Sequence, residues 1–434
     1  MDPQLIGIIG ISLLFLLLLI GMPIGFSLAF IGFWGIAFLT DIQVALPTLL
    51  RSFYSTFTTY AFTVIPLFVF MGELATVSGL SEGIYRVADK WLRRLPGGLG
   101  IATIGACSGF AAICGSSVAT AATLGKVALP EMKRYNYDTR LATGSVAAGG
   151  TLGFLIPPSI GFVVYGILTE QSIGKLLVSG FIPGFMLAAA YGIIIIVWVI
   201  YNPGAAPSSL DPVPFKEKMS SLKSIWELIT VFFLVMGGIY MGFFTPTEAG
   251  AIGAFFLFLV TAFRKRLTWS ALKNAMASAT KVSVMIFMIL AGAYLFTYFM
   301  ALTMIPMKLS IYLSELALSR YAILAVILIV FLILGCFLDA TSMMVLTLPV
   351  IFPTILKLGF DPIWFGVIAV LMMEAGLITP PLGLNIFVIS GVADVPMETV
   401  FKGSVFFLIA IFAVVFLITL FPQIALFLPG IMGR

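Results

Sequence analysis

Residues 148–159 read AGGTLGFLIPPS, and residues 374–385 read EAGLITPPLGLN. Each stretch lies in a long apolar segment and carries two adjacent prolines, Pro157-Pro158 and Pro380-Pro381, close to glycines. Proline has no amide donor and its ring clashes with the preceding helical turn, so we expect a helix to break at each pair. Within a membrane, such a break is tolerated only where protein or a cavity surrounds it. The two stretches therefore predict two discontinuous helices that face the protein interior.

The composition indicates that lipid is the solvent of this chain. Of its 434 residues, 61% are hydrophobic and 9% are charged, whereas about a quarter of an ordinary soluble domain is charged. Apolar runs that approach the roughly 20 residues of a membrane span recur along the whole sequence. The predicted fold class is an all-α polytopic membrane protein. The modest net charge of +5, without a basic patch interleaved with aromatics, argues against nucleic-acid binding.

Several kinds of chemistry are excluded or disfavoured by residue type. The chain has no histidine, which excludes a histidine-ligated metal and a histidine proton relay. Its three cysteines, Cys107, Cys114 and Cys336, form no CxxC pair and are interpreted as packing residues. The apolar run over residues 5–20 lacks a basic segment before it and a cleavage site after it, so we expect a retained first span.

The sequence is repeated at a constant offset of 223 residues. Four of the seven prolines between residues 23 and 158 fall on prolines of the second half, including both members of each double-proline pair. A proline-rich, charged stretch at 201–224 separates the halves, which predicts a first repeat over 1–200, a cytoplasmic linker over 201–224 and a second repeat over 225–434. Internal repeats of this kind are typical of secondary transporters.

The basic residues indicate how the two repeats are oriented. Most of the 23 Lys and Arg residues fall in the linker, in the loop near 264–273 and in first-half loops that lie on the same side, whereas the equivalent second-half loops carry few. Because basic loops stay in the cytoplasm, we expect inverted repeats with both chain termini on the outer side.

Two apolar stretches, at about 99–125 and 322–356, are too long and too interrupted for one helix each. Small and polar residues interrupt each of them in the middle, which predicts two re-entrant helical hairpins with their tips inside the membrane. Ser116 and Ser117 offer hydroxyls at the first tip, and Asp339, Thr341 and Ser342 offer a carboxylate and hydroxyls at the second. An ionisable group at this depth is costly and suggests function, so Asp339 is a candidate cation ligand.

The broken helices, at about 141–166 and 363–391, are the other half of the predicted site. Unwinding frees backbone carbonyls that can bind a hard cation such as Na⁺, and it exposes helix N-termini that suit an anionic substrate. Glu374, directly before the second break, is a site candidate, with pairing to a lysine as the alternative. A structural kink is the simpler interpretation of one double proline, but two at matched positions favour a binding site.

The residues that carry these features resemble those of a known family. Residues 115–120, the Ile-Pro-Pro-Ser at 156–159 and the Leu-Ile-Thr-Pro-Pro-Leu-Gly at 377–383 are similar to the large membrane subunit of tripartite ATP-independent periplasmic (TRAP) transporters. The likeness covers nearly the whole chain. It implies Na⁺-coupled import of organic acids such as dicarboxylates, keto acids or sialic acids. It also implies an elevator motion, in which hairpins and broken helices move against a fixed scaffold.

The resemblance further implies partners and ligands. The partners would be a small membrane subunit of about four helices, expected here as a separate chain, and a periplasmic substrate-binding protein; the location would be the bacterial inner membrane. It implies Na⁺ sites that fall near Ser116, Gly153 and Pro158, and near Gly335, Asp339, Gly376 and Thr379. The candidate Na⁺ and substrate residues are Gly115, Ser116, Ser117, Gly150, Gly153, Ile156, Pro157, Pro158, Gly335, Asp339, Thr341, Ser342, Glu374, Gly376, Thr379, Pro380, Pro381 and Asn385.

Two alternatives remain open from the sequence. A membrane-embedded enzyme such as an aspartyl protease needs two facing carboxylates, for which Asp339 and Glu374 are the obvious pair, although neither lies in a known catalytic motif. A non-transporting scaffold subunit would have no need for two matched interruptions of the backbone. No cofactor other than a coupling ion is expected.

Overall fold

The computed structural model describes residues 2–207, 212–315 and 318–432, and this part of the chain is helical throughout, without strands. Seven helices are long and apolar enough to cross a membrane, or eight if the pair Thr139–Leu155 and Ile160–Thr169, bent by 43°, counts as one span. The sequence prediction of an all-α polytopic membrane protein is therefore confirmed.

The first half of the chain contains the helices α1 to α11. They are α1 (Pro3–Leu19), α2 (Ile24–Leu39), α3 (Ile42–Thr58), α4 (Val64–Ser78), α5 (Leu80–Leu92), α6 (Gly98–Cys114), α7 (Ser117–Arg134), α8 (Thr139–Leu155), α9 (Ile160–Thr169), α10 (Ile173–Ser179) and α11 (Phe181–Tyr201). A short 3₁₀ turn at Tyr60–Thr63 precedes α4.

The expected linker contains a 3₁₀ turn at Pro203–Ala205, the helix α12 (Phe215–Leu222) and a second turn at Lys223–Ile225; its residues 208–211 lie outside the described ranges. The helices of the second half are α13 (Trp226–Phe232), α14 (Gly238–Tyr240), α15 (Pro246–Phe263), α16 (Trp269–Thr303), α17 (Ile305–Glu315), α18 (Arg320–Gly335), α19 (Ala340–Lys357), α20 (Pro362–Leu377), α21 (Leu384–Ala393), α22 (Met397–Leu420) and α23 (Gln423–Ile431), with a π turn at Phe233–Gly237.

Helix boundaries in the two halves correspond at the 223-residue offset. Adding 223 to the first and last residues of α7 gives the first and last residues of α19. Adding 223 to the first residue of α8 gives the first residue of α20. The first hairpin extends beyond its expected end near 125, because α7 continues to Arg134. Helix α16 is one continuous helix of 35 residues.

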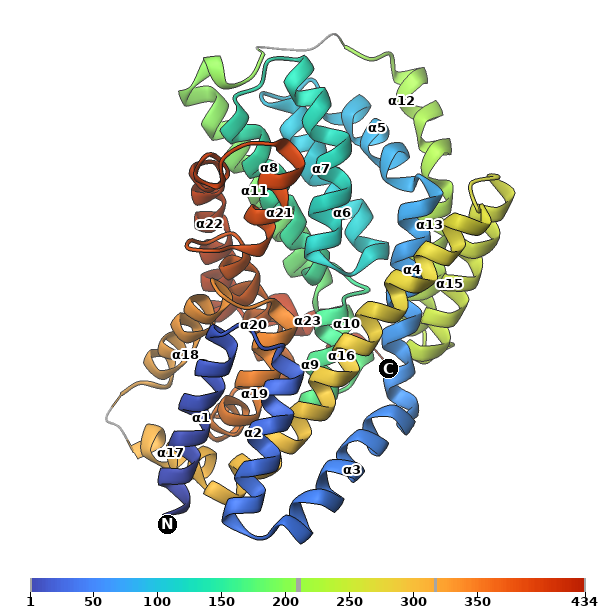
Figure 1. Ribbon diagram of the computed structural model, residues 1–434. Coiled ribbons are helices and arrows are strands. Elements are labelled where there is room, and N and C mark those ends of the chain that lie inside the picture. Colours follow the sequence, from blue (N-terminus) through green and yellow to red (C-terminus); the bar gives the residue numbers. More distant parts are fainter. Residues whose placement is uncertain (1, 208–211, 316–317, 433–434) are drawn as a thin grey trace.

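The helices form two packed groups (Figure 1). Hairpin α6–α7 packs against α8, with α21 and α22 alongside. Helices α2, α3 and α4 pack against the long α16, which crosses the molecule obliquely, and α15 packs on α4. The hairpin α18–α19 packs on α20 at the lower side of the view. The outer surface is apolar: Phe26, Phe30, Trp34 and Phe38 form an exposed stripe along α2, as expected for a helix that faces lipid.

Close contact between α2 and α16 depends on glycines. A Cβ atom added at Gly292 of α16 would lie 2.3 Å from the carbonyl oxygen of Gly25 and 3.1 Å from the amide of Ala29 in α2. The space on the other side is equally tight, since a Cβ at Gly25 would lie 2.9 Å from the carbonyl oxygen of Met288. Only glycine therefore allows the two backbones to approach this closely, as is common at helix crossings in membranes.

Gly292→Val is accordingly expected to lower the stability of the detergent-solubilised protein by about 1–3 kcal/mol, because the added side chain forces the two helices apart. Thermal unfolding measures this as a lower Tm. Gly391→Ala on α21 is the control, because a Cβ at Gly391 meets nothing within 4 Å. Equal Tm values for wild type and Gly292→Val would contradict the tight crossing.

Candidate functional site

The tip of the first hairpin lies against the break between α8 and α9. Gly115 and Ser116 connect α6 to α7; Gly115 has φ +65°, and Ser116 caps α7 by accepting a hydrogen bond from the amide of Ala119 at 3.4 Å. The amide of Ile160, at the start of α9, donates to the carbonyl of Gly115 at 3.3 Å. The hairpin tip thus supplies a partner for a backbone group that the break has freed.

Two glycines make this approach possible. A Cβ at Gly115 would lie 2.6 Å from the carbonyl oxygen of Pro158, and a Cβ at Gly153 would lie 2.4 Å from that of Ser116 and 2.7 Å from the hydroxyl of Thr120. Carbonyl and hydroxyl oxygens from the hairpin and the broken helix therefore gather around two positions without side chains.

The second hairpin meets the second break in the same way. The amide of Gly383, in the break between α20 and α21, donates to the carbonyl of Cys336 at 3.4 Å. A Cβ at Gly376 would lie 2.5 Å from the Cα atom of Gly335, so these two glycines bring the hairpin and α20 into backbone contact. Each hairpin tip thus lies against the break that follows it in the chain.

The residues at the second tip are engaged locally. Asp339 caps α19: its carboxylate accepts from the Ser342 amide at 3.1 Å and from the Ser342 hydroxyl. The hydroxyl of Thr379 donates to the carbonyl of Ala375 at 2.7 Å, and Thr341 is buried. In the first break, the amide of Ile156 donates to the carbonyl of Leu152 at 2.8 Å. Local capping thus accounts for the Asp339 carboxylate.

Hydrogen bonds between the two halves bring the two breaks to a shared centre. The hydroxyl of Ser117 donates to Oε2 of Glu374 at 2.7 Å, and Nδ2 of Asn385 donates to the carbonyl of Ala147 at 3.2 Å. A Cβ at Gly150 would lie 3.1 Å both from Nδ2 of Asn385 and from the carbonyl oxygen of Ser117. Ser117, Gly150, Glu374 and Asn385, all expected from the sequence, are therefore close neighbours. The described residues contain no lysine partner for Glu374.

Three buried side-chain oxygens near this centre have no hydrogen-bond partner among the described residues: Thr120 Oγ1, Glu374 Oε1 and Asn385 Oδ1. Glu374 is 1% exposed and Asn385 is fully buried. Leaving a buried polar atom unpaired is costly, so such atoms call for an explanation, often a ligand or an ion. Thr120 was not among the candidates from the sequence. Its position one helical turn after Ser116 is the signal that would have identified it.

Paired hairpin tips and helix breaks, within a helical protein whose outer surface is apolar, define a membrane transport protein. The family model described as "Tripartite ATP-independent periplasmic transporter, DctM component" matches residues 11–424. The chain belongs to this family.

Relatives agree with that assignment. The chain is 35% identical to the C4-dicarboxylate TRAP transporter large permease protein DctM of Pseudomonas aeruginosa, over 86% of this chain and 87% of that protein. It is 32% identical to the sialic acid TRAP transporter large permease protein SiaM of Vibrio cholerae, over 95% and 96% of the two chains. These relatives are permeases, so the chain is a transport protein and not an enzyme.

The fold is also similar to that of the Alcanivorax borkumensis YdaH transporter, with a TM-score of 0.62 over 100% of this chain and 98% of that one. At 14% sequence identity, this similarity concerns the fold alone.

Ser117→Ala is expected to lower the stability of the protein by about 1–3 kcal/mol, because it leaves Glu374 Oε2 buried without its donor. The measurement is Tm in detergent. Ser108→Ala on α6 is the matched control, since the Ser108 hydroxyl donates only to Ile104 in its own helix. A Ser117→Ala variant as stable as Ser108→Ala would show that the hydrogen bond between Ser117 and Glu374 contributes nothing to the stability of the protein.

Proposed function

We propose that this chain is the permease subunit of a Na⁺-coupled, binding-protein-dependent importer of small organic acids in the bacterial inner membrane. The observation that carries the proposal is the meeting of each hairpin tip with its helix break, joined at one centre through Ser117 and Glu374. A passive scaffold has no need for two matched interruptions of the backbone within the membrane, which favours a transporter.

Na⁺ would bind as a transported ion beside the cargo. At the first tip, the carbonyls of Ser116 and Pro158 and the unpaired hydroxyl of Thr120 surround Gly115 and Gly153. These are oxygen donors of the kind that hard cations prefer. At the second tip, the backbone around Gly335, Gly376 and Thr379 would serve in the same way, with Asp339 lending negative charge in addition to capping α19.

The cargo is proposed to be an organic anion held near the break, where the N-termini of α9 and α21 point their partial positive charge. The names of the relatives include C4-dicarboxylate and sialic acid, and both of these molecules are carboxylates. The name of the family, a tripartite periplasmic transporter, supports two partners: a small membrane subunit and a periplasmic binding protein. We propose that the two halves are inverted repeats and that the two hairpins and broken helices move together as an elevator.

Uptake into proteoliposomes tests this function. The chain is reconstituted with its small membrane subunit and cognate binding protein, and uptake of radiolabelled organic acids is compared with an inward Na⁺ gradient and with K⁺ in its place. We expect accumulation only with Na⁺. Intact assembly without uptake of any organic acid would favour the scaffold alternative.

Thr120→Val keeps the shape of the side chain but removes the unpaired hydroxyl. We expect the Na⁺ concentration for half-maximal uptake to rise about fivefold or more, as for loss of about 1 kcal/mol of binding. Thr419→Val on α22 is the control, because the Thr419 hydroxyl donates only to Val415 in its own helix. An unchanged Na⁺ dependence in Thr120→Val would remove this hydroxyl from the ion site.

Asp339→Ala is expected to weaken the Na⁺ dependence of uptake. Asp339→Asn separates the two roles of the carboxylate, which are capping α19 and lending negative charge to the proposed ion site. Asparagine caps a helix as well as aspartate does, so a role in capping alone predicts wild-type behaviour for Asp339→Asn. If the charge supports ion binding, both variants need more Na⁺. Unchanged Na⁺ activation in both would exclude Asp339 from the site.

A further inference from the structure

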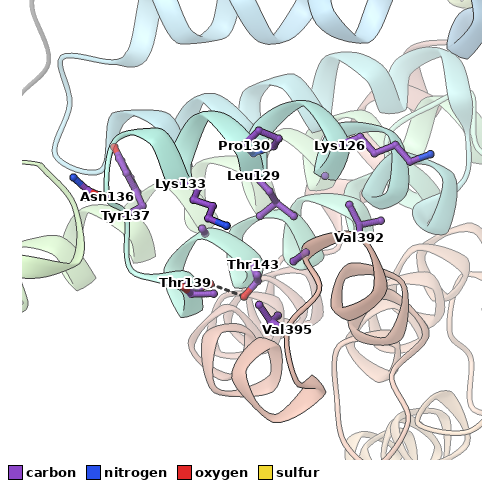
Figure 2. A pocket seen from close by; sticks show the side chains of 13 residues that line it. Lys126, Leu129, Pro130, Lys133, Asn136, Tyr137, Thr139, Thr143, Val392 and Val395 are labelled. Carbon is purple, nitrogen blue, oxygen red and sulfur yellow. Dashed lines mark hydrogen bonds between the residues drawn. The ribbon is translucent and has the colours of Figure 1, made fainter.

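A pocket lies away from the helix breaks, between α7, the start of α8 and the turn that follows α21 (Figure 2). Its volume is about 730 Å³, within the range of roughly 300–1,000 Å³ found for small-molecule sites. Lys126 and Lys133 come from the α7 side, and Val392 and Val395 from the opposite side. Asn136, Tyr137, Thr139 and Thr143 add polar groups, so the pocket is not merely a gap for lipid tails.

The charge in this pocket is positive and uncompensated. Neither Lys126 nor Lys133 forms an ion pair with a residue that the structure describes, and no carboxylate lines the pocket. The acids nearest in sequence, Glu131 and Asp394, are not among the lining residues. Two cations with an apolar wall behind them attract an anion more strongly than cations in open water.

Neighbouring cations differ from these two lysines because they already have partners. Arg140 pairs with Asp138 at 3.0 Å, and Lys402 pairs with Glu398 at 2.8 Å. Partial burial disfavours the charged form of Asp138, but hydrogen bonds from Arg140 outweigh it and lower the pKa of that carboxyl. Asp138 and Glu398 are thus paired with Arg140 and Lys402, and neither forms an ion pair with Lys126 or Lys133.

One face of α7 connects this pocket to the hairpin tip. Positions 116, 119, 123, 126, 130 and 133 follow each other at spacings of three and four residues and therefore lie on the same side of the helix. All are at least partly exposed, whereas Leu124, Ala128 and Met132 on the opposite side are buried. The accessible face therefore leads from Ser116, at the proposed cation site, past Thr123 to the two lysines.

We propose that this pocket is a separate binding site for a small organic anion, with one carboxylate at Lys126 and the other at Lys133, on the cytoplasmic side of the transport path. That this anion is the transported cargo rests on the proposed function. Seven residues of helix separate the two lysines by about 10 Å along the axis, and their flexible side chains can reach both ends of one elongated dicarboxylate. The basic loops beside the pocket put it on the cytoplasmic side.

Lysine footprinting tests this site without requiring transport. The full-length chain, with the membrane subunit that copurifies with it, is treated briefly with an amine-acylating reagent, and modification of each lysine is measured by mass spectrometry. The probes are succinate and N-acetylneuraminate, each against chloride at equal ionic strength, and phosphatidylglycerol in mixed micelles. Lys273 on α16, which is exposed and without an ion pair among the described residues, is the internal control.

We expect succinate, which has two carboxylates, to slow acylation of Lys126 and Lys133 at least twofold and saturably. N-acetylneuraminate, which has one carboxylate, should protect them less, and neither anion should change Lys273. Because one succinate would contact both lysines, Lys133→Gln should raise the succinate concentration for half-maximal protection of Lys126 about fivefold, while Lys273→Gln should not change it. This outcome would support the site even if the uptake assay failed, because footprinting needs only binding.

Three results would overturn the proposal. Equal slowing at Lys273 would mean general screening of charge, and protection of Lys126 unaffected by Lys133→Gln would mean that the lysines do not share a ligand. Protection by phosphatidylglycerol alone, or by none of the three probes, would mean that the pocket does not bind cargo; in the former case it would be a site for anionic lipid headgroups.

Discussion

The structure depends on one constraint: backbone amides and carbonyls inside a membrane need partners within the protein. The chain breaks two of its helices, at 156–159 and 378–383, and so frees backbone groups at both places. Each break is then met by the tip of a hairpin, through Ile160 and Gly115 in one half and through Gly383 and Cys336 in the other. Each hairpin tip thus supplies a backbone acceptor to an amide that the helix break leaves free.

This constraint also explains why small residues occur where they do. Gly115 and Gly153 let a hairpin tip reach the first break, and Gly335 and Gly376 do the same at the second. A side chain at any of the four would meet backbone atoms at 3.0 Å or less. At these positions glycine lets the two backbones approach each other closely. Backbone carbonyl oxygens therefore contribute much of the polar surface where each hairpin tip meets its break.

Much of this was predictable because it follows from proline, glycine and polarity. The double prolines located both breaks, the 223-residue offset predicted matching elements in the two halves, and Ser117, Glu374 and Asn385 were among the site candidates that the structure brings together. The extent of α7 to Arg134 was missed, because apolar composition alone does not fix where a helix ends once tertiary packing supports it. The link from Ser117 to Glu374 was also beyond the sequence, since it joins positions 257 residues apart.

The two halves share a backbone plan but differ in side chains, and this difference bears on function. Ser116 and Asp339 occupy the same repeat position, and both cap the second arm of their hairpin. Thr151 and Glu374 also correspond, yet Thr151 bonds Tyr191 within its own half, whereas Glu374 reaches across to Ser117. A carboxyl group occurs at both positions only in the second half. The two hairpin tips thus share a backbone arrangement but differ in side chains, so any molecule bound between the halves would meet unequal surroundings.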